Sequence, residues 1–271
     1  MGKLLMPFRT LYKIYYLSIF ALLMIVTFPL YHVLLTRKKK FRTAFILIRV
    51  HSWILMLLTG VIPRIKGAIH IPEKGPFIIC ANHTSFIDSF CIYFVFNSYF
   101  VFTGKKEIEK WPLFHIFYTS GMNIIVDRGS VAGSYSALKR MTEELRKGNS
   151  LAIFPEGTRS EHPPKLEQFK SGAFALAIQA QVPIVPVSFI SNWKRLGRGG
   201  MFTGSASPGF SDIVIHKPVV TKGMKKSDVD VLQSAVEQII SAPILRTCRY
   251  ECERCSYYDV LKQKCFDTHS L

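Results

Sequence analysis

Two long apolar segments near the N-terminus constrain this chain more than any other feature of its sequence. Residues 17–35 carry no formal charge, and residues 44–62 are interrupted only by Arg49 and His51. Each segment approaches the roughly 20 residues that a helix needs to cross the hydrocarbon core of a bilayer. The first is long for a cleavable signal peptide, and no small-residue cleavage site follows it. We therefore expect a retained pair of hydrophobic helices that anchors the protein in a membrane.

Basic residues surround both segments, and their positions bear on the topology. They are Lys3, Arg9, Lys13, Arg37, Lys38, Lys39, Lys40, Arg42, Arg64 and Lys66. Two complete crossings would place the central group, residues 37–42, across the membrane from both ends, although basic loops tend to stay in the cytoplasm. A shallow hairpin in the cytoplasmic leaflet keeps every basic flank on one side. We expect this hairpin, with the rest of the chain at the cytoplasmic face; two crossings are the alternative.

Beyond residue 66, short apolar runs alternate with amphipathic stretches, which is typical of α/β domains. The expected strands are residues 77–81, 99–102, 122–126, 151–154, 184–189 and 213–216, and the expected helices are residues 86–96, 134–146, 170–180 and 228–240. We expect a central mixed sheet flanked by helices over residues 67–245, between a hairpin of residues 1–66 and a cysteine-rich tail of residues 246–271. Residues 192–209 are rich in Gly and Ser, which predicts a mobile loop over a site or a sheet edge.

The charge of the chain narrows the choice of partner. Its 35 Lys and Arg against 18 Asp and Glu give a net charge of +17, which attracts anionic lipids, phosphorylated metabolites or nucleic acids. A nucleic-acid binder would explain the charge but not the two apolar segments, so we expect membrane lipids and no nucleic acid as partners. The chain contains no Walker loop, no G-x-G-x-x-G and no G-x-S-x-G. Nucleotide hydrolysis, dinucleotide chemistry and serine esterase chemistry therefore lack support.

The first candidate for chemistry is the stretch NHTSFID at residues 82–88, which follows an apolar strand. His83 lies in the loop after the strand and Asp88 in the first turn of the expected helix, so their side chains can meet. An imidazole oriented by a carboxylate is suited to act as a general base. Ser85 and Asp88 also have the spacing of a capping box, so the alternative is that Asp88 only caps the helix and His83 is an ordinary loop residue.

A second loop, FPEGTRS at residues 154–160, follows another expected strand. Gly157 permits a close approach of the backbone to a ligand, Thr158 offers a hydroxyl, and the Arg159 guanidinium matches two phosphate oxygens. Arg128 and Lys105 also lie near strand ends. Since strand ends in such sheets border the ligand crevice, we expect these groups to bind an anion. The alternative is a plain turn with solvated basic side chains.

These residues resemble the motifs of the membrane-bound glycerophospholipid acyltransferase family, most of all its 1-acyl-sn-glycerol-3-phosphate acyltransferases. Four blocks match in order across residues 67–187. They are N-H-x-x-x-x-D at residues 82–88, an apolar strand ending in Arg at residues 121–128, F-P-E-G-T-R-S at residues 154–160, and a proline-containing strand at residues 182–187. A single short block arises by chance, but the first and third together, about one βαβ unit apart, favour the resemblance.

The resemblance implies transfer of a fatty acyl group from acyl-CoA or acyl carrier protein to the sn-2 hydroxyl of lysophosphatidic acid, which gives phosphatidic acid. It implies that His83 is the general base and that Asp88 orients it. The implied acceptor-binding residues are Glu156, Gly157, Thr158 and Arg159, and Arg128 would add positive charge beside them. Lys105 is expected at the same site from its place near a strand end. No metal is expected, and the acyl donor is a substrate rather than a cofactor. The sequence does not identify the donors to the oxyanion; backbone amides at the helix start near Ser85 are candidates.

Two alternatives stay open. Within the acyltransferases, the acceptor can be another lysophospholipid, a lyso-ornithine lipid or glycerol 3-phosphate. Outside them, a noncatalytic membrane lipid-binding protein would use the same basic loop, although it would not need the pair of His83 and Asp88.

Four cysteines gather near the C-terminus, in the pattern C-x3-C-x2-C-x9-C. They are Cys248, Cys252, Cys255 and Cys265. Four thiolates suit zinc, but the spacing is irregular and contains a single Cys-x-x-Cys pair. We therefore expect a reduced, disordered tail rather than a metal site.

Overall fold

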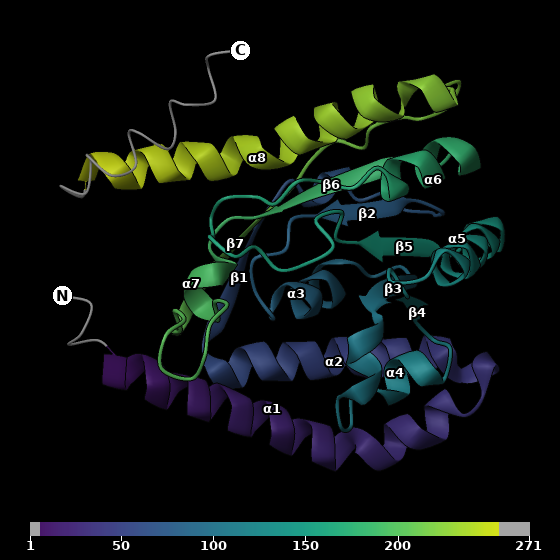
Figure 1. Ribbon diagram of the computed structural model, residues 1–271. Coiled ribbons are helices and arrows are strands. Elements are labelled where there is room, and N and C mark those ends of the chain that lie inside the picture. The colour runs from purple at the N-terminus through teal and green to yellow at the C-terminus, as the bar shows by residue number, and fades with distance from the viewer. Residues whose placement is uncertain (1–5, 255–271) are drawn as a thin grey trace.

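Two antiparallel helices form one side of the molecule. The computed structural model describes the backbone of residues 6–254 and the side chains of residues 6–247. Helix α1 spans Met6–Leu35 and α2 spans Phe41–Thr59, joined by the short 3-10 turn Lys38–Lys40. Both are long and apolar enough to cross a membrane, by length and composition. The hairpin lies along the α/β body, with α2 between α1 and that body (Figure 1).

Much of the apolar surface of this hairpin faces outward. Phe8 of α1 and Leu57 of α2 are 72% and 80% exposed, and several other large apolar side chains of both helices are exposed too. A continuous apolar surface of this kind costs free energy in water and is typical of sites that contact a membrane or a partner. Together with the helix lengths, it indicates membrane association.

A seven-stranded mixed sheet forms the centre, in the order β1-β7-β6-β2-β5-β3-β4. The strands are β1 Val61–Lys66, β2 Ile78–Ala81, β3 Phe100–Lys105, β4 Ile124–Val126, β5 Ser150–Ile153, β6 Ile184–Phe189 and β7 Gly209–Ile215. Only the pair β6–β7 is antiparallel; the neighbouring pairs are parallel. The α/β class with a mixed sheet, expected from the alternating pattern, is confirmed. Because β2, β5 and β3 are parallel neighbours, the loops after them leave the same edge of the sheet.

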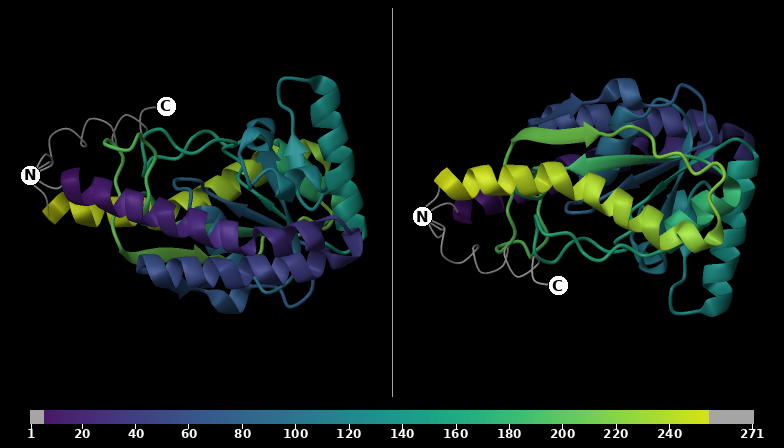
Figure 2. Two further views of the ribbon diagram at one scale, coloured as in Figure 1. Left: turned by 90° about the horizontal axis from the view of Figure 1, so that it is seen from below. Right: turned by 90° about the horizontal axis from the view of Figure 1, so that it is seen from above.

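Helices cover both faces of this sheet. The remaining helices are α3 Asp88–Val95, α4 Ile116–Thr119, α5 Val131–Arg146, α6 Gly172–Ala180, α7 Asn192–Arg195 and α8 Val229–Arg254, with 3-10 turns at Ala68–His70, Lys106–Lys110 and Lys226–Asp228. The hairpin, α3 and α4 share one apolar core with the sheet, and α5, α6 and α8 share the other. Figure 2 shows the two outer layers, the hairpin from below and α8 from above.

The sequence pattern misses the edge strand β1. Its apolar residues 61–62 continue the second apolar segment, so hydropathy alone assigns them to a helix. In the structure Gly60 ends α2 with a left-handed φ of 68° and its carbonyl accepts a hydrogen bond from Gly209 N at 2.8 Å. Strand β1 then pairs with β7. The sheet thus begins before residue 67, and the proposed division at residue 66 stays a prediction.

Two other expectations at element scale need correction. The expected loop of residues 192–209 begins with helix α7, and β7 starts at its last residue. The last helix, expected at residues 228–240, continues to Arg254 past Pro243. The tail expected to be disordered from residue 246 therefore begins within α8, which includes residues 246–254. The four tail cysteines lie outside the described side chains, so the expectation about zinc stays a prediction.

Candidate active site

The loop after β2 is held against a neighbouring strand by Asn82. This buried amide donates to the Phe189 carbonyl at 3.0 Å and accepts from the Phe189 N–H at 2.7 Å, at the end of β6. Asn82 thereby replaces the ladder hydrogen bonds that end with the two strands. The next residue, His83, starts from a fixed backbone position at the carboxyl edge of the sheet.

His83 and Asp88 form a hydrogen-bonded pair. The Nδ1 atom of His83 lies 2.9 Å from Asp88 Oδ2, and Asp88 is fully buried at the first turn of α3. An Nδ1–H that donates to this carboxylate leaves Nε2 as a hydrogen-bond acceptor. The imidazole also stacks on the Phe154 ring, with centroids 4.0 Å apart, and its side chain is 18% exposed. The ring is therefore oriented by two contacts and remains accessible.

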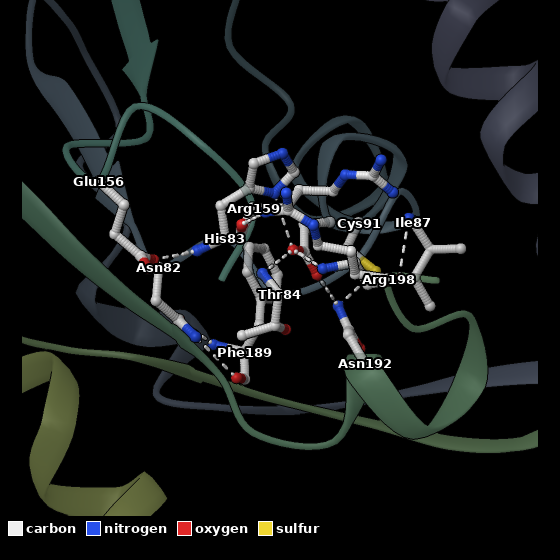
Figure 3. A network of polar contacts seen from close by, with 12 residues as sticks. Asn82, His83, Thr84, Ile87, Cys91, Glu156, Arg159, Phe189, Asn192 and Arg198 are labelled. Atoms are coloured by element: carbon white, nitrogen blue, oxygen red, sulfur yellow. Dashed lines mark hydrogen bonds and ion pairs between the residues drawn. The ribbon is translucent and has the colours of Figure 1, made fainter. Parts of the chain in front are cut away.

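The carboxylate of Asp88 is itself oriented by three further donors. Backbone N–H groups of Thr84 and Ser85 each donate to Oδ2 at 2.7 Å, and the Asn192 side chain donates to Oδ1 at 2.8 Å. Figure 3 shows this network around His83. Asp88 therefore contacts the helix start and the histidine together, so the alternative of a carboxylate that only caps the helix does not describe it. The capping box is incomplete, because the Asp88 N–H donates to the Ser85 carbonyl at 3.3 Å rather than to the Ser85 hydroxyl.

Three backbone amides near Ser85, which were candidate donors to an oxyanion, already have acceptors. The Thr84 and Ser85 N–H groups donate to Asp88, and the Ile87 N–H lies 3.3 Å from the Ser85 hydroxyl. Asp88 follows Ser85 by three residues and Thr84 by four, so its carboxylate is close enough to accept from both N–H groups.

Glu156 joins the two loops of the site. Its Oε1 accepts from the His83 N–H at 2.5 Å and its Oε2 from the Glu167 N–H at 2.8 Å. The side chain is buried, and burial raises the pKa of Glu156 to about 8 against the opposing effect of the two N–H donors. Glu156 is absent from the described lining of the cavity below, so its contacts are those of a residue that orders the loops.

Gly157 allows the Arg128 guanidinium to approach the loop backbone. Arg128 Nη1 donates to the Gly157 carbonyl at 2.5 Å, and Gly157 has a left-handed φ of 71°. A Cβ atom at position 157 would collide with that guanidinium. A glycine is therefore required here both for the backbone conformation and for the contact.

The basic side chains expected to bind an anion line one cavity of about 360 Å³ together with His83. They are Lys105, Arg128 and Arg159, beside Gly157 and Thr158. Burial lowers the pKa of Arg159, and the neighbouring Arg198 charge lowers it further. Burial and the Arg128 charge likewise lower the pKa of Lys105. Like charges crowded in a partly buried space favour an anionic ligand.

Apolar side chains form much of the remaining cavity wall, and some of them come from the membrane hairpin. These lining residues include Phe86, Phe90, Tyr93, Phe102, Phe114 and Phe117 from the α/β body, and Met24, Tyr31 and Ile48 from α1 and α2. The cavity thus joins a base, a group of cations and an apolar wall. A molecule with an anionic head and a long apolar chain matches all three.

Known proteins resemble this chain in sequence and in fold. The sequence model described as "Acyltransferase" matches residues 62–190, which contain the loops of both motifs. Residues 62–190 of the chain are therefore similar to the acyltransferase family. The chain is 31% identical over 183 residues to "1-acyl-sn-glycerol-3-phosphate acyltransferase alpha" of Mus musculus, and 31% identical over 181 residues to "1-acyl-sn-glycerol-3-phosphate acyltransferase" of Saccharomyces cerevisiae.

The matches leave part of the acyltransferase relatives uncovered. They span 66% and 65% of this chain, and 62% and 57% of the mouse and yeast proteins. The fold resembles the crystal structure of "the 1-acyl-sn-glycerophosphate (LPA) acyltransferase, PlsC, from Thermotoga maritima", with a TM-score of 0.73 and 24% identity. That match covers 91% of this chain and 98% of the solved one, and so includes the hairpin region in the shared fold.

Two residues at this candidate site are not predicted from the sequence. Asn192 is buried, donates to Asp88, and accepts from the Ser211 hydroxyl at 2.5 Å. Arg198 lines the cavity with Arg159. Both follow β6 and lie beyond residue 190, where the family model ends. The one local signal is that Asn192 closely follows a buried apolar strand, as His83 does.

Proposed function

We propose that this protein transfers a fatty acyl group from a thioester donor to the sn-2 hydroxyl of 1-acyl-glycerol 3-phosphate, which gives phosphatidic acid. The observation that carries the proposal is the presence of the His83–Asp88 pair, the cations and an apolar wall in one cavity. The names of the curated relatives support the same reaction. Acyl-CoA and acyl carrier protein both present the required thioester.

The mechanism follows from the hydrogen bonds of His83. Its Nε2 takes the proton of the sn-2 hydroxyl while that oxygen attacks the thioester carbonyl carbon. Asp88 stabilises the imidazolium that forms and keeps the ring in one orientation. When the tetrahedral intermediate collapses, the C–S bond breaks and the imidazolium returns the proton to the departing thiolate. The products are the ester and the free thiol, and His83 is neutral again.

The basic groups hold the acceptor in this mechanism. Arg159 presents a planar pair of donors that fits two phosphate oxygens, and Lys105 and Arg128 add positive charge. Glu156 keeps the loop of Arg159 attached to the backbone of His83. The distance from the phosphate to the reacting hydroxyl is then set by two loops that are joined to each other.

The apolar hairpin supports a site at a membrane surface. Lysophosphatidic acid has one apolar chain and a phosphate head, so it resides at that surface. A hairpin embedded in the cytoplasmic leaflet would bring the cavity to it, with the α/β body on the cytoplasmic face. The net charge of +17 would attract anionic lipids to the same place.

One assay tests this function. The purified protein in detergent is incubated with labelled acyl-CoA or acyl carrier protein thioester and a panel of acceptors: lysophosphatidic acid, other lysophospholipids, a lyso-ornithine lipid and glycerol 3-phosphate. We expect labelled phosphatidic acid as the main product. Transfer to another acceptor in preference to lysophosphatidic acid would correct the substrate. No transfer to any acceptor would refute the function and favour a noncatalytic lipid-binding protein.

A further inference from the structure

A fourth cation reaches the cavity from a loop outside the two sequence motifs. Arg198 lies in the segment 196–208 and lines the cavity beside Arg159. Its Nη1 donates to the Arg159 carbonyl at 2.6 Å, and its Nη2 lies 3.0 Å from Glu161 Oε1. The Arg198 side chain is 38% exposed, and Glu161 is 60% exposed. Figure 3 shows Arg159 and Arg198 together beside His83. The guanidinium of Arg198 is thus positioned by contacts and still reaches solvent.

The base of this loop is attached to the His83 motif. The Leu196 carbonyl accepts from the Ser85 hydroxyl at 2.5 Å, and Gly197 pairs with Ser85 in a single antiparallel bridge. On the other side of the loop, Gly197 N donates to the Ser205 carbonyl at 2.8 Å. Arg198 therefore follows a backbone segment whose position is defined relative to the proposed base.

The tip of the loop is attached to the membrane hairpin. Lys13 of α1 is 4% exposed, and its Nζ donates to the Gly200 carbonyl at 2.7 Å. Arg198 lies between this contact and the Ser85 contact. Because the loop is attached at both contacts, the Arg198 guanidinium is held near Arg159 before a ligand binds. Ligand binding then costs little further conformational entropy.

Four basic groups exceed the charge of a singly ionised phosphate. Among the described residues, Lys105, Arg128, Arg159 and Arg198 line the cavity, with Glu107 as an acidic neighbour in the same lining. A phosphate monoester carries about −1.5 to −2 charges at pH 7, since its second pKa is near 6. A phosphate diester carries one negative charge at the same pH. A phosphate monoester therefore carries additional negative charge that a second guanidinium can neutralise, and a diester does not.

We infer that Arg198 is a specificity-determining residue that binds the second negative charge of a phosphate monoester, so that the site selects monoester over diester headgroups. This inference rests on the proposed function and deepens it, since it states why lysophosphatidic acid is accepted in preference to lysolipids with a substituted phosphate. Arg159 binds either class, and Arg198 adds a charge-assisted bond that only the dianion satisfies fully.

The experiment compares Arg198→Gln with wild type in detergent. It measures kcat and KM for lysophosphatidic acid, which is a phosphate monoester. It also measures the inhibition constant of lysophosphatidylglycerol, a phosphate diester, and this constant can be obtained even if the diester is not acylated. We expect the variant to raise KM for lysophosphatidic acid about tenfold or more, with kcat changed much less. The inhibition constant for the diester should change less than about twofold, which is within the range of a screened surface charge. Arg198→Lys keeps the charge without the fork and should restore part of the loss.

One control variant separates binding from a general effect of removing a surface charge. Arg146→Gln makes the same chemical change at an exposed position at the end of α5. It should keep the preference for the monoester. An equal loss for both headgroups in Arg198→Gln, or an unchanged KM, would overturn the inference. Wild-type protein that acylates neither lipid would instead refute the proposed function itself.

Discussion

Asp88 accepts four hydrogen bonds, and these bonds fix the position of the carboxylate that contacts His83. Three donors are the His83 ring and the two backbone N–H groups of Thr84 and Ser85, and the fourth is Asn192. These donors hold the carboxylate in one position. It can therefore orient the imidazole of His83 in the proposed reaction.

The first prediction at this scale concerns the base. We expect His83→Ala to lower kcat about 10²- to 10⁴-fold, since removal of a general base usually has an effect of this size. Thermal unfolding should change little, because the ring is partly exposed and Asp88 keeps three other donors. His115→Ala is the control, because His115 is not among the described lining residues. A folded His83→Ala protein with near-normal turnover would contradict the assignment.

The second prediction follows from the raised pKa of Glu156, about 8 in the folded protein against an ordinary value of 4.5. The folded state binds this proton more tightly than the unfolded state. The stabilisation is complete below pH 4.5 and is lost as the pH rises toward 8. The free energy of unfolding should therefore fall across this range by up to about 1.4 kcal/mol per pH unit.

Glu156→Gln cannot titrate and tests this linkage. Unfolding of both proteins is followed in detergent between pH 5.5 and pH 8, where the other groups contribute equally to both. We expect the wild type to lose more stability than the variant over this range. Parallel pH profiles would show that Glu156 has an ordinary pKa.

At the scale of elements, the site depends on which loops meet. The loops after β2 and β5 are joined by Glu156 and by the hydrogen bond from Ser160 N to the His83 carbonyl at 2.8 Å. The loop after β4 reaches the same place through Arg128 and Gly157. The order of strands in the sheet, rather than their order in the chain, brings these loops together.

Gly157→Ala tests the contact between two of these loops. An alanine at a φ of 71° costs about 1 to 2 kcal/mol, and its Cβ would also displace the Arg128 guanidinium. We expect lower stability and a higher KM for the acceptor. Gly148→Ala is a matched control, because Gly148 has a φ of 82° and no atom within 4 Å of an added Cβ. It should lower stability and leave KM unchanged. Equal acceptor KM values in the two variants would contradict the proposed role of Arg128 in holding the acceptor phosphate.

At the scale of the whole molecule, the hairpin belongs to the folded core. Tyr16 and Leu35 of α1 and Phe45 and Leu55 of α2 are almost completely buried. The opposite surface of both helices is apolar and exposed. The hairpin therefore has two apolar surfaces, one that packs on α3 and α4 and one that faces outward, where lipid would cover it.

This arrangement predicts how the protein is held in a membrane. Charge attraction is strongly screened at 1 M salt, where the Debye length is about 3 Å, whereas burial of apolar surface in lipid is not. We expect the protein to remain in the membrane pellet after washing with 1 M salt and to be released by detergent. Release by salt alone would show that surface charge, not the hairpin, holds it.

The features that the sequence determined by itself are local. The apolar segments, the alternating α/β pattern, and the meeting of His83 with Asp88 all depend on residues within about one element of each other. Hydrophobic periodicity and spacing along one turn of helix suffice to predict them. The anion-binding character of the loop at residues 154–160 is also predicted locally, because it follows from the types of its own residues.

Tertiary structure alone decided the contacts between distant segments. Asn192 meets Asp88 across 104 positions, and Lys13 meets Gly200 across 187. The edge strand β1, residues 61–66, pairs with β7, residues 209–215, which is distant in the sequence. No local pattern encodes such pairs, because packing of the two cores and the strand order select them. For the same physical reason, Arg198 and the hairpin side chains in the cavity wall became visible only once the chain was folded.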